Sequence, residues 1–424
     1  MAAHIPQELR DHIVDVFQDD RESLKTCALI GRVWTSRAQS RLFRSLTVKR
    51  LAHYAEWNSF FYSSPHIARH VRALNLMGKP VSFEESELPE EWLWILETLH
   101  RVESLIVCAC TFPKLSLKIT VELPRLLSNI KQLSFLNISM PAGDLWTYLG
   151  ACTRLRKLAV RLVESPDCKS TASKDERGHI YSRAIGPVDT LECTTTQPVA
   201  SWLLFNRAHN DFLIRRLALT CYEDSVQNPA QAMNALLTHA APTLEHLVLS
   251  VGSDLGGFPG WNLSRMDKLK TIHLRADSRD LSVLSEWNKQ FPHEWMPLTV
   301  EDMIQQKLPS LQEVRITLRL LDLHHDSSMR LGRMDAALSG LLGSRQELSF
   351  VLNIVGTMVS STRIGLVRRK VKLALPRTLL WRRQIKEAYY GTNWDEDAVF
   401  GGGLDPFARN GLIPGFQGYC RLLF

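Results

Sequence analysis

The sequence lacks the features that mark secreted, zinc-binding or membrane-spanning proteins. Its 424 residues include only eight cysteines, which are scattered and form no CxxC pair, so neither a disulfide framework nor a zinc site is indicated. Its longest uncharged stretches, such as 348–362, have about 15 residues, whereas a spanning helix needs about 20 mainly apolar ones. No basic region followed by an apolar run opens the chain. We therefore expect no secretory signal, no membrane contact and a cytoplasmic or nuclear location.

Signatures of catalysis are also missing. His293 and Glu294 begin the pattern HExxH, but Pro297 stands where the second histidine should be. There is no GxSxG nucleophile elbow, and the glycines at 401–403 have no following Lys-Ser/Thr that would hold a phosphate. We therefore expect no catalytic residues, no metal and no cofactor. An enzyme with an unfamiliar set of residues remains an open alternative.

What the sequence does contain is ample apolar material and one concentration of charge. Hydrophobic residues make up 45% of the chain, which is enough for a folded core. A single core stops growing near about 250–300 residues, so we expect two or more units or one elongated array. The formal net charge is +7, and residues 361–390 alone hold nine basic residues and one acidic residue. The rest of the chain is therefore nearly neutral.

The first fifty residues predict three short helices. Residues 5–17 place Leu9, Ile13, Val16 and Phe17 at helical spacing, with Pro6 suited to the first turn. Asp19 and Asp20 offer a cap for a second helix, and Gly31 is a plausible break before a third. On these helices, Leu24, Cys27 and Ala28 share one face and Trp34, Ala38 and Leu42 share another. Such a small cluster buries little surface by itself, so some apolar residues should pack against the rest of the chain or a partner.

This segment resembles an F-box, in the variant common among F-box-like proteins of mushroom-forming fungi. The resemblance covers roughly residues 3–48 and rests on Ile5-Pro6-x-Glu8-Leu9, Ile13, Leu24, Ala28-Leu29, Val33-Trp34 and Arg41-Leu42-Phe43. It implies docking on a Skp-type adaptor, which joins the chain to a cullin ubiquitin ligase. The residues implied to bind the adaptor are Ile5, Pro6, Leu9, Ile13, Leu24, Leu29 and Trp34, with Trp34 anchoring the helix packing. A plain helical cap on the following domain is the alternative.

From residue 71 onward, apolar residues recur at positions i, i+3 and i+5, as in a leucine-rich strand. The nine trios are Val71/Leu74/Leu76, Val102/Leu105/Val107, Leu133/Leu136/Ile138, Leu155/Leu158/Val160, Val188/Leu191/Cys193, Ile214/Leu217/Leu219, Leu244/Leu247/Leu249, Leu269/Ile272/Leu274 and Leu311/Val314/Ile316. Their starts are 22 to 42 residues apart, which leaves room for a strand and a helix in each repeat. This pattern predicts a solenoid whose strands stack into one parallel sheet.

The predicted fold class is therefore α/β. A three-helix F-box over residues 1–50 is followed by an irregular leucine-rich-repeat-like solenoid over 51–390 and a Gly-rich irregular tail over 391–424. Helices are expected at 89–102, 200–212, 229–242 and 327–343, and insertions at 163–187 and 277–307. Repeats of this degenerate kind are also what F-box proteins often carry after the F-box.

The basic block near the C-terminus allows more than one reading. Residues 370–375 alternate like a strand, and residues 376–390 read as a helix that begins at Pro376. The plain interpretation is the last strand and capping helix of the solenoid. The alternative is an anion site for an acidic or phosphorylated partner, formed by Arg368, Arg369, Lys370, Arg382, Arg383 and Lys386. Nucleic acid is a less favoured partner for the same residues.

Taken together, the sequence predicts a non-catalytic substrate receptor of a Skp–cullin–F-box ubiquitin ligase, with the repeats binding a target protein. A repeat-domain scaffold or interaction module without a ligase link is the competing class, and a basic-surface nucleic-acid binder is a third.

Overall fold

A computed structural model describes the greater part of the chain. It covers residues 5–18, 20–48, 54–77, 92–112, 117–140, 142–164, 188–194, 213–221, 229–251, 261–263, 265–276, 295–306, 308–320, 332–345, 347–356, 375, 377–378 and 385–390. The chain forms two compact units, divided between Pro187 and Val188. In the described segments, no helix is both long and apolar enough to cross a bilayer.

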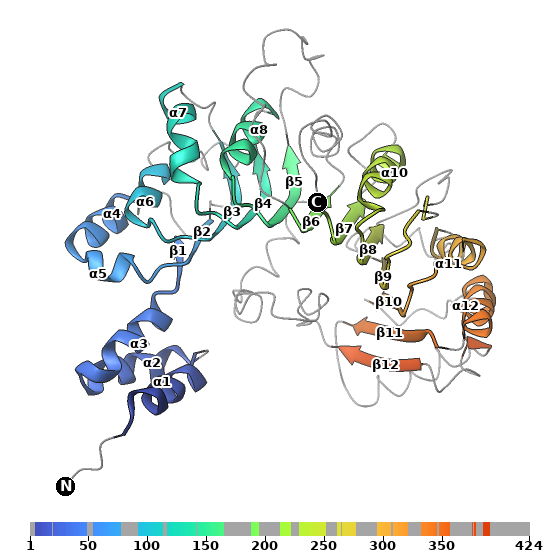
Figure 1. Ribbon diagram of the computed structural model, residues 1–424, viewed down its shortest axis with the longest axis horizontal. Coiled ribbons are helices and arrows are strands. Elements are labelled where there is room, and N and C mark those ends of the chain that lie inside the picture. The colour runs from blue at the N-terminus through green and yellow to red at the C-terminus, as the bar shows by residue number, and fades with distance from the viewer. Residues whose placement is uncertain are drawn as a thin grey trace. The chain divides into compact units, whose positions relative to one another are not determined.

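The first unit opens with a cluster of three helices, drawn in dark blue in Figure 1: α1 (Gln7–Val16), α2 (Arg21–Ile30) and α3 (Arg32–Leu42). Asp20 caps α2, since its side chain accepts hydrogen bonds from the backbone N–H groups of Glu22 and Ser23 at 3.1 and 3.2 Å. Gly31 separates α2 from α3. Pro6 lies directly before α1 and not in its first turn. The three predicted helices are thus confirmed.

The helical cluster has its own small core. Val14, Leu24, Cys27 and Ala38 are buried, and Ala28, Trp34 and Leu42 pack against them. These are the residues that the helical spacing predicted for α2 and α3. On α1, however, the buried positions are Arg10 and Val14. The apolar residues predicted for one stripe of α1 lie outside this core.

The rest of the first unit is a parallel sheet with helices in its connections. The strands are β1 (Ser45–Val48), β2 (Ala73–Met77), β3 (Ser104–Thr111), β4 (Gln132–Ser139) and β5 (Lys157–Glu164). They pair in chain order. The connections hold α4 (Tyr54–Ser63), α5 (Pro65–Ala68), α6 (Trp92–Thr98), α7 (Leu117–Leu126) and α8 (Ala142–Ala151). In Figure 1, α6, α7 and α8 lie on the same side of these strands.

The second unit repeats the same architecture. Its strands are β6 (Thr190–Thr194), β7 (Arg216–Cys221), β8 (His246–Val251), β9 (Thr271–Ala276), β10 (Glu313–Leu320), β11 (Ser349–Gly356) and β12 (Ile385–Tyr390). They also pair in chain order, and every pairing is parallel. The connections contain α10 (Pro229–Ala240), α11 (Trp295–Gln305) and α12 (Gly332–Ser344). The predicted α/β class and the leucine-rich-repeat-like parallel sheet are confirmed.

Each of the nine predicted trios lies at a strand, from β2 to β10, but the trio assigned to β4 is out of register. Leu133 pairs with Leu105 of β3, and Phe135 pairs with Val107. The equivalent trio is therefore Ile130, Leu133 and Phe135, all of them buried. Leu136, predicted as an inward residue, is only partly buried.

A backbone irregularity explains this error. Ala109 in β3 adopts a φ of 52°, in the left-handed region that a non-glycine residue seldom occupies. Leu105 and Val107 are buried in alternation, but the next buried residues are Cys108 and Cys110, so the alternation changes phase directly before Ala109. In β4 the buried positions likewise change from Leu133 and Phe135 to Ile138. Leu133, Leu136 and Ile138 therefore have the spacing of a trio, although only Leu133 belongs to the true one.

The helix predicted from residue 376 is wrong at its C-terminal end. Residues 385–390 form strand β12, in which Ile385 pairs with Phe350 of β11. Isoleucine and tyrosine favour extended backbone, and the exposed edge of β11 supplies hydrogen-bond partners that a surface helix would leave unused. Strands β1 and β11 also add to the nine predicted repeats. Of the predicted strand at 370–375, only Leu375 is described, and it is not in a strand. The predicted helix at 200–212 and the Gly-rich tail lie outside the described residues.

Three other predicted elements are confirmed in part or whole. Residues 89–102 contain α6, whose Trp92, Ile95 and Leu96 are buried. Residues 229–242 and 327–343 contain α10 and α12. The predicted insertion at 277–307 contains helix α11, whose Trp295 is buried. Of the insertion predicted at 163–187, the described residues are only the end of β5.

Candidate docking face of the N-terminal helices

Helix α1 presents an apolar stripe to solvent. Leu9 is 55% exposed and Val16 is 68% exposed, and Ile13 between them is also exposed. Ile5 and Phe17 extend the stripe beyond the two ends of the helix. Because the inward side of α1 is held by Arg10 and Val14, the stripe is not needed for the core of the cluster.

A second exposed apolar group lies where α2 ends and α3 begins. Leu29 is 86% exposed, and Ile30 and Val33 are exposed as well. The starts of α1 and α3 are joined by the Gln7 side chain, whose Nε2 donates a hydrogen bond to the carbonyl oxygen of Val33 at 3.4 Å. Among the described residues, eleven large hydrophobics are exposed, and eight of them lie between Ile5 and Val33. Exposed apolar surface is therefore concentrated on the helical cluster.

The seven residues implied to bind an adaptor fall into two groups. Ile5, Pro6, Leu9, Ile13 and Leu29 face solvent. Leu24 is buried in the core of the cluster, and Trp34 packs against that core. The structure thus brings the first group to the surface and gives the other two a packing role.

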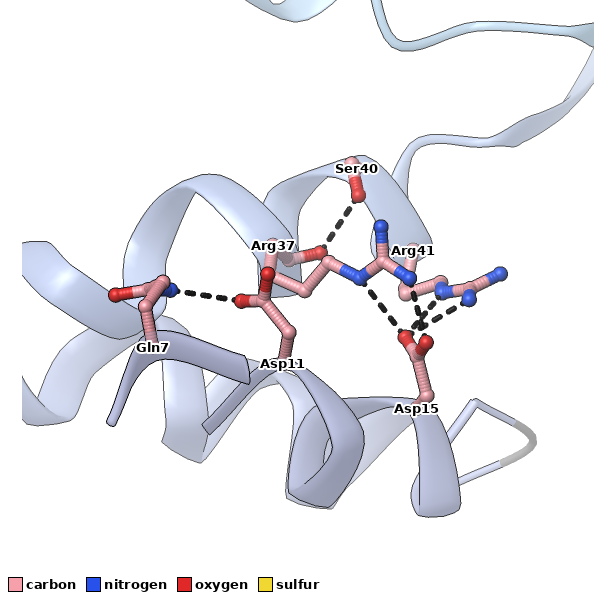
Figure 2. Close-up of polar contacts among 6 residues, drawn as sticks. All are labelled: Gln7, Asp11, Asp15, Arg37, Ser40 and Arg41. Carbon is pink, nitrogen blue, oxygen red and sulfur yellow. Dashed lines mark hydrogen bonds and ion pairs between the residues drawn. The ribbon is translucent and has the colours of Figure 1, made fainter. Parts of the chain in front are cut away.

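A charged contact fixes α1 against α3 on the side away from the stripe. Figure 2 shows the Asp15 carboxylate between Arg37 and Arg41, one helical turn apart on α3. Asp15 Oδ1 accepts from Arg37 Nε at 2.9 Å and from Arg41 Nε at 2.8 Å. These bonds hold the pKa of Asp15 below its ordinary value, and the carboxylate raises that of Arg37. The sequence analysis did not single out this contact, although opposite charges on neighbouring predicted helices are a signal for it.

Arg10 is an unexpected member of the inward face of α1. Its side chain is buried, yet its Nε has no hydrogen-bond partner in the part of the chain that the structure describes. An unpaired buried donor costs about 1–3 kcal/mol. The core of the cluster is small, and the unpaired Arg10 Nε lowers its stability. The Asp15 contact therefore matters more for holding α1 in position.

The predicted anion site cannot be assembled from the described residues. Arg368, Arg369, Lys370, Arg382 and Arg383 lie outside them. Lys386 lies in β12, where its backbone pairs with Val351. In the described ranges there is no group of three or more His, Cys, Asp or Glu side chains that could hold a metal ion.

No family model matches the sequence, and no curated protein matches it.

Proposed function

We propose that the protein is the substrate receptor of a Skp–cullin–F-box type ubiquitin ligase. In this proposal the α1–α3 cluster docks on a Skp-type adaptor through its exposed apolar residues. The repeat domain binds a target protein, and the chemistry of ubiquitin transfer belongs to other subunits. The observation that carries the proposal is the concentration of exposed apolar side chains on α1 and at the α2–α3 corner.

The physical argument concerns the cost of that exposure. A hydrophobic side chain gains about 1.5–3 kcal/mol when it is fully removed from water, and contiguous exposed apolar surface marks interaction sites. Leu9, Ile13 and Leu29 lie on the surface of a cluster that has its own core. A partner helix laid on this surface would gain the burial that the chain itself leaves unused. The resemblance of residues 3–48 to an F-box supplies the identity of that partner.

A repeat-domain scaffold without a ligase link is the alternative. In that case the N-terminal helices cap the parallel sheet, and their exposed apolar residues have no specific partner. The two functions differ in one measurable property, which is capture of a Skp-type adaptor by the intact chain.

The test is a pull-down of a purified Skp-type adaptor by the full chain. We expect the wild type to retain the adaptor and the double variant Pro6→Ala/Leu9→Asp to retain at least about tenfold less, because a charge is placed in an interface that must lose its water. Leu9 is exposed, so the variant should keep its circular dichroism spectrum and melting temperature.

Val121→Asp is the matched control. Val121 lies on α7 of the repeat domain and is 71% exposed, so the same type of change is made at a comparable site outside the cluster. It should leave adaptor capture unchanged. Failure of the intact chain to retain any adaptor would overturn the proposal, as would equal loss in both variants.

A further inference from the structure

A cleft of about 710 Å³ lies within the first unit, between α3 and the starts of β2 and β3. Ten described residues line it, and none of them is phenylalanine, tyrosine or tryptophan. Six are arginines: Arg37, Arg41, Arg44, Arg69, Arg72 and Arg101. None of these six belongs to the basic block near the C-terminus that the sequence pattern emphasised.

Two structural patterns bring the arginines together. On α3 and just after it, Arg37, Arg41 and Arg44 are spaced by four and three residues, which places them on one side of the helix. The other three arginines lie just before strands: Arg69 and Arg72 precede β2, and Arg101 precedes β3. Arg72 N donates to the carbonyl oxygen of Arg44 at 2.8 Å, and Glu103 N donates to that of Arg72 at 2.8 Å. Arg44 and Arg72 are therefore neighbours in the backbone hydrogen-bond ladder.

The positive charge of the cleft is only partly neutralised. Arg37 and Arg41 share Asp15, and Arg72 lies 4.0 Å from Glu103, which also binds Lys131 at 2.9 Å. In the segments that the structure describes, the guanidinium groups of Arg44, Arg69 and Arg101 make no hydrogen bond or ion pair. Six arginines thus face two carboxylates, which leaves four positive charges in surplus. Like charges placed side by side are destabilising unless something compensates them.

We propose that this cleft binds a small anion that carries two or more phosphate groups. Guanidinium groups bind phosphate oxygens through paired N–H donors, and the three unpaired arginines supply such donors from three different segments. Ser36 and Ser40 add hydroxyl groups to the lining. The cleft and the docking face share no residue, since none of the exposed apolar side chains lines the cleft.

The dimensions and lining favour a small ligand over a nucleic acid or a phosphorylated protein. Pockets for small molecules have volumes of about 300–1,000 Å³, and this cleft falls in that range. Single-stranded nucleic acids are held by aromatic side chains on which bases stack, and the described lining has no Phe, Tyr or Trp. Nor does it contain the apolar side chains that would receive the flanking residues of a phosphopeptide.

His70 reports on the electrostatic environment of the cleft. Its pKa lies below the usual value, first because the ring is partly buried and then because of the positive charges of Arg69, His66, Arg101 and Arg72. A bound polyphosphate would offset those charges and raise the pKa of His70. The ring therefore provides a spectroscopic signal of occupancy that does not depend on any biological activity.

The experiment is calorimetric titration of the full chain with inorganic tripolyphosphate. We expect saturable binding that is stronger than binding of orthophosphate. The variant Arg44→Gln/Arg69→Gln/Arg101→Gln should weaken it by about tenfold or more, because a hydrogen bond to a charged group contributes a factor of about ten or more. In NMR titrations, the pKa of His70 should rise when tripolyphosphate is added to the wild type and should rise less in the variant.

The matched control removes the same charge outside the cleft. Arg21→Gln/Arg32→Gln/Arg265→Gln changes three exposed arginines that do not line it, and we expect unchanged tripolyphosphate affinity. Absence of binding at millimolar tripolyphosphate, or equal weakening by both triple variants, would overturn the proposal. The proposal would also be overturned if the cleft arginines were needed to bind a phosphopeptide or an oligonucleotide but not tripolyphosphate, since the ligand would then be a macromolecule. None of these outcomes depends on adaptor capture.

Discussion

Replacing Asp15 by alanine should release α1 from α3 without unfolding the repeat domain. Asp15 accepts hydrogen bonds from Arg37 and Arg41, and the three side chains are only partly exposed. An exposed ion pair contributes about 0.2–1 kcal/mol. We expect about 1–2 kcal/mol here, because one carboxylate serves two arginines and solvent screening is reduced.

That loss is large for a cluster with so small a core. A change of about 1–2 kcal/mol raises the population of the locally opened state by roughly 5–30-fold. Hydrogen exchange measured by mass spectrometry on peptides of α1 should detect it, with the amides of β3 and β4 unchanged. Asp11→Ala is the control, because Asp11 lies one turn earlier on α1 and accepts its hydrogen bond from Gln7.

The sign of the pH dependence gives a second check. The pKa of Asp15 is lowered in the folded protein, so its stabilisation is complete above the ordinary carboxyl value and is lost as the pH falls through the lowered pKa. The difference between wild type and Asp15→Ala should therefore be equal at pH 7 and pH 5 and should shrink below about pH 4. Equal exchange of the α1 amides in both proteins at pH 7 would refute the reasoning.

Two further predictions concern buried groups of the repeats. Burial, together with nearby Arg275 and Arg315, holds the pKa of His273 well below its usual value, so stability should fall as the pH drops below about 6.5, by up to about 1.4 kcal/mol per pH unit. Thermal melting of His273→Gln should accordingly depend less on pH between 7 and 5 than that of the wild type, and parallel pH profiles would contradict this. Burial also raises the pKa of Cys152 and Cys193 to about 12, with Glu192 adding to the effect at Cys193. Iodoacetamide at pH 8 should leave both thiols unmodified in the native protein and alkylate them after unfolding, as read by peptide mass spectrometry; similar labelling rates in the two states would show that the thiols are accessible.

The repeating strands could be predicted from the sequence because their second and third apolar residues point into one continuous core. Leu74 and Leu76 of β2 pair in register with Leu105 and Val107 of β3, and all four are buried. This periodicity follows from side-chain alternation along a strand. The helices of the N-terminal cluster were equally predictable, since Leu24 and Trp34 mark their inward faces.

The parts that could not be predicted depend on non-local contacts. The backbone irregularity at Ala109 accompanies a change in which residues of β3 and β4 are buried, and no local sequence pattern predicts it. Residues 385–390 have a helix-compatible apolar spacing, but pairing with β11 decides their conformation. The arginine cleft is assembled from α3, from the residues around His70 and from the turn that contains Arg101. These segments are up to 64 residues apart in the sequence, from Arg37 to Arg101. The distribution of charge along the sequence shows only local density and does not predict that they meet.

In the described repeats, the residue just before a strand makes a recurring backbone contact that does not involve its side chain. Its backbone carbonyl accepts two N–H groups from the next repeat, as Arg44 O does from Arg72 and Ala73 and Glu245 O does from Lys270 and Thr271. These backbone hydrogen bonds do not depend on the side chain, which can form ion pairs with its neighbours, as Glu103 does with Lys131 and Glu245 with Lys270. The charges of the residues before successive strands can therefore change one at a time during evolution while the strands stay in register. A protein of this design can therefore acquire or exchange an ionic ligand with little penalty to its folding.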